Sequence, residues 1–130
     1  MSVSLLLITH DNIGTALMDT ATAMLGVSPM QVDIIAVRRG NNPDDVVAEA
    51  ERIIHDHEQT LVLTDMYGST PSNIACRLHT QASVRVVGGI NLPMLIRVLN
   101  YPRLSLDELV DKAISGGRDG VLSCKTEQDE

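Results

Sequence analysis

The apolar residues of the chain fall into short aliphatic runs, separated by longer segments in which apolar positions recur at helical spacing. The first run is too short for a helix and is apolar on both alternating faces, as in a strand buried on two sides. Three later runs have the same character. The pattern therefore predicts four buried strands, at 3–8, 32–37, 61–63 and 84–87.

The segments between these runs carry helix start signals. Asn42 precedes a proline at the first helical position, and Ser105 forms a capping-box pattern with Glu108. Thr70, also followed by a proline, is a further expected cap. The predicted helices span 14–25, 42–57, 70–79, 93–99 and 105–114.

The C-terminal part of the chain combines a predicted helix end with a predicted edge strand. Gly116 and Gly117 are expected to end the last helix, because glycine favours helix termination. Residues 121–123 are expected to form a short edge strand. No linker interrupts the alternation, so residues 1–124 are predicted to form one domain and residues 125–130 a polar tail.

Strands that alternate with helices indicate an α/β fold. We expect a doubly wound, mostly parallel four-stranded sheet with helices on both faces. In such sheets, ligands bind outside the carboxyl ends of the strands, where the strand order reverses. Candidate chemistry is therefore expected in four loops, at 9–12, 38–42, 65–72 and 88–93.

Composition narrows the function further. The 130 residues are 44% hydrophobic and 21% charged, which is ordinary for one globular domain. A net charge of −7, with two tyrosines as the whole aromatic content, disfavours nucleic acid binding. The apolar runs are too short to cross a membrane. With no secretory leader, the two cysteines are interpreted as reduced thiols of a cytoplasmic protein.

His10 and Asp65 are the two residues most suggestive of chemistry, because each follows a predicted buried strand. If these strands are neighbours, the two side chains meet in one crevice. A carboxylate that binds one imidazole nitrogen fixes the tautomer and leaves the other nitrogen free as a nucleophile.

A candidate anion-binding cradle follows Asp65 at the start of the third predicted helix. Its backbone N–H groups and hydroxyls are suited to bind phosphoryl oxygens. The predicted phosphoryl-binding residues are Gly68, Ser69, Thr70 and Ser72. The predicted crevice lining is Thr9, Met66, Tyr67 and Asn91.

Other interpretations of these residues remain open. A histidine after a strand is often only a loop residue, and Thr-Pro is often only a helix cap. His10, Asp11 and Asp65 form a weak metal ligand set, and no metal site is predicted. Ser69 lacks the motif of a serine nucleophile.

Four segments in the same order resemble the enzyme IIA component of the mannose type of the bacterial phosphoenolpyruvate-dependent sugar phosphotransferase system. The resemblance covers nearly the whole chain. The four segments are Thr9-His10, residues 63–73 (LTDMYGSTPSN), residues 88–95 (GGINLPML) and residues 116–120 (GGRDG).

The resemblance implies that His10 accepts a phosphoryl group from the phosphocarrier HPr and passes it to an enzyme IIB component. Asp65 is then the orienting carboxylate, and no dissociable cofactor is needed. The family also implies a homodimer that exchanges the C-terminal strand, here 121–123, and a peripheral association with a IIC/IID permease. The role is either sugar uptake or regulation through the phosphorylation state.

Two departures from the family pattern stand next to Asp65. Met66 replaces a residue that often carries a hydroxyl, and Tyr67 replaces a frequent tryptophan. Two alternatives to the carrier remain. The phosphotransferase subunit of dihydroxyacetone kinase has a similar fold and an early histidine, and a non-catalytic small-anion binding module would use the same crevice without covalent chemistry.

Overall fold

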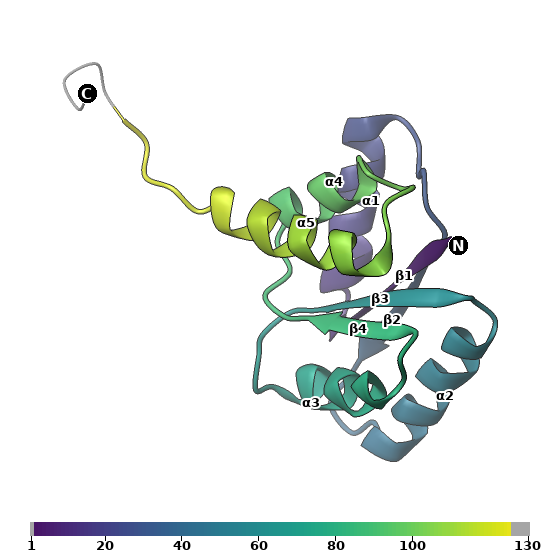
Figure 1. The fold of residues 1–130 in the computed structure, drawn as a ribbon. Helices are drawn as coiled ribbons and strands as arrows, with labels where there is room; N and C mark the ends of the chain where they lie inside the picture. Colours follow the sequence, from purple (N-terminus) through teal and green to yellow (C-terminus); the bar gives the residue numbers. More distant parts are fainter. Residues whose placement is uncertain (1, 126–130) are drawn as a thin grey trace.

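Four parallel strands form the single sheet of the computed structural model, which describes residues 2–125 (Figure 1). The strand order is β2-β1-β3-β4, and all three pairings are parallel. The predicted sheet is therefore confirmed and is entirely parallel. The strands are β1 (Val3–His10), β2 (Val32–Val37), β3 (Gln59–Thr64) and β4 (Val84–Val87).

Helices cover both faces of this sheet, as the alternating pattern predicts (Figure 1). The helices are α1 (Ile13–Leu25), α2 (Pro43–His55), α3 (Thr70–Arg77), α4 (Leu92–Leu99) and α5 (Leu106–Asp119), and a 3₁₀ turn (Leu78–Thr80) follows α3. Leu5 and Leu7 of β1 pack into the core beneath α1, α4 and α5, whereas Leu6 and Ile8 pack into the core beneath α2 and α3. Burial on both faces explains why residues 5–8 form an unbroken aliphatic run.

The strand order reverses between β1 and β3. The chain leaves β1 toward β2 on one side and later places β3 on the other side. His10 pairs with Val37 of β2, and Ile8 pairs with Thr64 of β3. The residues that follow these strands therefore meet at the carboxyl edge of the sheet, where an α/β fold places its ligands.

Helix caps agree with the sequence at two positions and differ at a third. Asn42 accepts a hydrogen bond from the N–H of Asp44, and Ser105 and Glu108 form the predicted capping box. The cap of α3, however, is Ser69, and Thr70 is the first helical residue. Since Pro71 fits anywhere in the first turn, its position does not fix the boundary to one residue.

The predicted end of the last helix is wrong, because α5 continues to Asp119. Gly116 and Gly117 are buried within the helix, where they let α5 approach α4 closely. A Cβ atom at Gly116 would lie 2.8 Å from the Cβ of Arg97, and one at Gly117 would lie 2.9 Å from the Cε of Met94. The two glycines are therefore packing positions.

The predicted edge strand at 121–123 is not formed in the described chain, because residues 121–125 have no regular structure. Val121 and Leu122 are highly exposed. Of the predicted tail, all but Lys125 lies outside the described residues. Both cysteines are free. Among the described residues, none of the helices combines the length and the apolar character that a membrane crossing requires.

Candidate functional site

His10 and Asp65 come together at the point where the strand order reverses. His10 is the last residue of β1, and Asp65 directly follows β3. The Oδ2 atom of Asp65 accepts a hydrogen bond from the backbone N–H of His10 at 2.8 Å and lies 2.7 Å from Nδ1 of the same residue. This contact orients the ring through Nδ1. The other ring nitrogen, Nε2, makes no contact with Asp65.

Exposure differs between the two partners. The side chain of His10 is 43% exposed, whereas that of Asp65 is 12% exposed. A partly buried carboxylate that holds an accessible imidazole is the arrangement that presents one ring nitrogen to an incoming group.

The electrostatics of Asp65 favour its charged form. Burial alone raises the pKa of this carboxyl, but hydrogen bonds from His10 and from the N–H of Met66 outweigh burial and lower the pKa below the usual value. Asp65 therefore remains an acceptor-only carboxylate at neutral pH. Since such a group can bind Nδ1 only when this nitrogen carries the proton, Nε2 has a free lone pair when the ring is neutral.

A cleft of about 460 Å³ opens beside His10. Its walls come from the ends of β1 and β2 and from the start of α3, and they include Asp11, Arg38, Arg39, Thr70 and Pro71. The sequence predicts 38–42 as one of the loops that carry chemistry but indicates no role for Arg38 or Arg39 within it. The available signal is that Arg38 directly follows the predicted strand 32–37, and the pairing of β2 with β1 places it next to Asp11.

The predicted cradle is only partly directed toward this cleft. Thr70 lines the cleft together with His10. The hydroxyl of Ser69 donates to the carbonyl of Met66, and the buried hydroxyl of Ser72 accepts from the N–H of Gly68. The Ser69 and Ser72 hydroxyls thus hold the turn that precedes α3.

The four predicted lining residues lie in three different places. Met66 and Tyr67 are 64% and 82% exposed on the loop after β3. Thr9 is fully buried, and its hydroxyl accepts a hydrogen bond from the N–H of Gly14 in the first turn of α1. Asn91 caps α4 through the N–H of Met94 and donates to the carbonyl of Gly117. The walls of the His10 cleft include none of these four residues.

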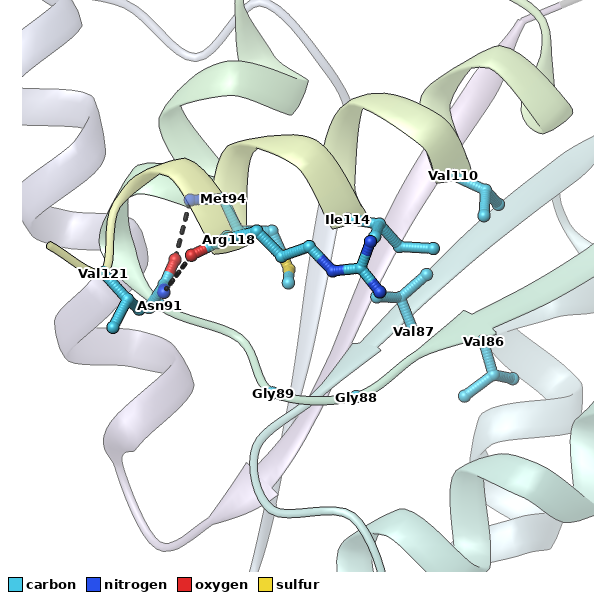
Figure 2. Close-up of a pocket in the computed structure, with 11 residues that line it drawn as sticks. Val86, Val87, Gly88, Gly89, Asn91, Met94, Val110, Ile114, Arg118 and Val121 are labelled. Atoms are coloured by element: carbon cyan, nitrogen blue, oxygen red, sulfur yellow. Dashed lines mark hydrogen bonds between the residues drawn. The ribbon is translucent and has the colours of Figure 1, made fainter.

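Asn91 belongs to a second and larger groove, of about 650 Å³, between β4 and α5 (Figure 2). Figure 2 shows Asn91 near one end of the groove and Val86 near the other, with both hydrogen bonds of the Asn91 amide drawn. Most of the lining is apolar, with Arg118 as its one charged residue. His10 does not line this groove.

Fold and site together define a class of protein: a doubly wound α/β domain that presents one accessible histidine, held by a carboxylate, at the carboxyl edge of its sheet. Residues 4–114 match the model of the EIIA-man family, described as "PTS system fructose IIA component". The chain therefore belongs to this mannose-type family of phosphotransferase-system IIA components.

Individual relatives agree with this assignment. The chain is 30% identical over 131 residues to the mannose-specific EIIAB component of Escherichia coli (strain K12), a match that covers 96% of this chain and 40% of that protein. The chain thus spans less than half the length of the curated relatives it matches.

Two solved structures have the same fold over nearly the whole chain. The mannose/sorbose specific IIA subunit from Enterococcus faecalis has a TM-score of 0.86 at 26% identity, with 97% of each chain covered. The phosphotransferase system component EIIA from Streptococcus agalactiae has a TM-score of 0.85 at 26% identity, covering 93% of this chain and 96% of its own.

Proposed function

We propose that this chain is a phosphohistidine carrier in which Nε2 of His10 accepts a phosphoryl group from HPr and passes it to an enzyme IIB component. The observation that supports this most directly is the 2.7 Å contact between Nδ1 of His10 and Oδ2 of Asp65. It occupies one ring nitrogen and leaves the other as the nucleophile on a half-exposed side chain.

The transfer is balanced without a further reactant. The lone pair on Nε2 of His10 forms a bond to phosphorus, while the bond between phosphorus and the phosphohistidine of the donor breaks. The electron pair of the broken bond returns to the donor imidazole. The proton on Nδ1 stays in place, and the carboxylate of Asp65 stabilises the positive charge that the ring gains. No dissociable cofactor takes part.

This chain has exposed apolar residues near His10 that could contact protein partners. Ile13, Met66 and Tyr67 lie on the segments that follow β1 and β3, and these residues are 44%, 64% and 82% exposed. Exposed apolar and aromatic side chains around a reactive group are typical of a docking site. We assign this surface to successive contact with HPr and with the IIB component, in sugar uptake or in its regulation.

The homodimer with an exchanged C-terminal strand also belongs to this proposal. β4 pairs only with β3 among the described residues, so its outer edge is unpaired. The groove of about 650 Å³ runs between this edge and α5, and Val121 and Leu122 are both 77% exposed beside it. In the exchanged dimer, residues 121–123 of each subunit would pair with β4 of the other subunit, which would bury Val121 and Leu122.

The proposed role further places the protein in the cytoplasm, in peripheral association with a IIC/IID permease. Association with membranes that contain such a permease, and its absence from membranes that lack it, is the corresponding measurement.

The decisive experiment is intact-mass analysis at neutral to alkaline pH after incubation with phosphoenolpyruvate, enzyme I and HPr. We expect one acid-labile phosphoryl group on the wild type and none on His10→Ala. His79→Ala is the matched control, because His79 is an exposed histidine outside the site. This variant should be phosphorylated like the wild type.

Other outcomes favour other functions. If the wild type takes no phosphoryl group from active HPr, the carrier role is wrong, and the small-anion binding module is favoured. If the chain is phosphorylated but passes the phosphoryl group to dihydroxyacetone kinase and not to a IIB component, the phosphotransferase subunit of that kinase is favoured. Size-exclusion chromatography with light scattering tests the dimer, which a chain truncated after Gly120 should not form.

A further inference from the structure

Arg38 occupies a position beside the nucleophile that the family resemblance does not explain. It directly follows β2, whose last residue Val37 pairs with His10. Neighbouring strands lie about 4.8 Å apart, a distance well within the reach of an arginine side chain. His10 is therefore flanked by the carboxylate of Asp65 from β3 on one side and by Arg38 from β2 on the other.

The backbone around Arg38 is fixed by its own turn. The N–H of Arg38 donates to the side-chain oxygen of Asn41 at 2.7 Å, and the N–H of Asn41 donates to the carbonyl of Arg38 at 3.0 Å. Gly40 supplies the positive φ of 91° that this turn requires. The turn presents the side chain of Arg38 at the cleft beside His10.

The guanidinium itself is only loosely held. Nη1 of Arg38 lies 3.6 Å from Oδ1 of Asp11, and the two side chains are 61% and 67% exposed. Exposed ion pairs of this length contribute little and exchange partners easily. A phosphoryl group is a stronger partner for an arginine, because its oxygens carry more charge and match the geometry of the guanidinium.

The charged residues that line the cleft also favour binding of a phosphoryl group. Besides His10, its ionisable lining is Arg38, Arg39 and Asp11, which is a local positive excess in a chain of net charge −7. A phosphoryl group on His10 adds about two negative charges close to Asp11 and Asp65. Without a nearby cation, this repulsion would oppose transfer to His10.

We propose that Arg38 is a phosphoryl-binding residue, which leaves Asp11 and binds a phosphoryl oxygen when Nε2 of His10 is phosphorylated. The inference rests on the proposed carrier function and adds a residue to its site. Arg38 supplies a donor in a site where Met66 has no hydroxyl to offer. Asp11 then acts as the resting partner of the guanidinium.

The test measures the rate and the equilibrium of phosphoryl transfer from phosphorylated HPr to the full chain. Losing one charge-assisted contact in Arg38→Gln should reduce transfer about tenfold to a hundredfold. Arg38→Lys keeps the charge and should recover part of the loss. Arg52→Gln is the matched control, since it removes the same charge from the last turn of α2, away from the cleft. It should transfer like the wild type.

Two further readouts separate binding from structure. The ³¹P NMR signal of the phosphohistidine should shift in Arg38→Gln, while the thermal midpoint of the unphosphorylated protein stays unchanged.

A second variant tests the resting ion pair. Asp11→Asn removes the carboxylate that competes for the guanidinium of Arg38 and also a charge that repels the phosphoryl group, so it should move the transfer equilibrium toward His10.

Equal transfer by Arg38→Gln and Arg52→Gln would overturn the role of Arg38 and leave the carrier function intact. Reduced transfer by Asp11→Asn would overturn it as well, because the ion pair rather than the free guanidinium would then be needed. A wild type that accepts no phosphoryl group overturns both the inference and the carrier function.

Discussion

A single oxygen of Asp65, Oδ2, binds both the backbone N–H and the imidazole Nδ1 of His10, at 2.8 Å and 2.7 Å. The end of β1 and the orientation of the ring therefore depend on the same carboxylate. Since Asp65 directly follows β3, the contact also joins two neighbouring strands where the strand order reverses.

Asp65→Asn should slow phosphoryl transfer to His10 about tenfold to a hundredfold. The amide can still accept a hydrogen bond, but it carries no charge to stabilise the phosphorylated ring. Rapid-quench measurement of the transfer rate tests this, with circular dichroism to confirm that the variant is folded. A folded Asp65→Asn protein with the wild-type rate would remove the orienting role of Asp65.

Acid should weaken the fold partly through Asp65. The pKa of this carboxyl is lower in the folded protein than its usual value of 3.8, so the charged form stabilises the native state. This contribution is fully present above the unfolded pKa and is lost as the pH falls through the folded one. Urea unfolding from pH 7 down to acid should show the stability difference between wild type and Asp65→Asn shrinking below about pH 3.8. A difference that does not depend on pH would contradict this assignment.

The fold could be predicted because each strand is rich in aliphatic residues and several helices begin with a recognisable cap. The approach of His10 to Asp65 follows from their positions after two predicted strands, if these strands are neighbours. The hydrogen-bond partners of individual side chains could not be predicted in this way. The hydroxyls of Thr9 and Ser72 accept hydrogen bonds from the N–H groups of Gly14 and Gly68, and only the structure shows these pairings.

The end of α5 shows a second limit of the sequence. A pair of glycines has the same appearance in the sequence whether it ends a helix or allows two helices to touch. The difference lies in what surrounds the missing Cβ atoms, and for Gly116 and Gly117 this is α4.

Among the described residues, Asp11 is the one non-glycine residue with a positive φ, which is 42°. Asparagine adopts this conformation more readily than most residues, whereas alanine does not. Asp11→Asn should therefore keep the wild-type stability, and Asp11→Ala should lose about 1 kcal/mol. Chemical denaturation of the two variants checks this, and equal stabilities would indicate that the backbone at this position relaxes without cost.

Gly116→Ala should destabilise the protein, although alanine is the better helix former. The new methyl group would lie 2.8 Å from the Cβ of Arg97, so α5 and α4 must move apart. We expect a loss of about 1 to 3 kcal/mol. Asp111→Ala, at an exposed position of the same helix, serves as the control for helix propensity. A stabilised Gly116→Ala protein would show that the helix contact is looser than the structure indicates.

The orientation of His10 by Asp65 has a consequence for the kinetics of the proposed reversible carrier. An imidazole that is oriented by the fold has already lost its rotational entropy before any partner arrives, so this cost is not incurred again at each encounter. The saving applies to the forward and the reverse reaction alike, because both pass through the same transition state. In the proposed carrier, orientation by Asp65 should therefore speed exchange in both directions, and the direction of net transfer would be set by the phosphorylated partners that surround the protein.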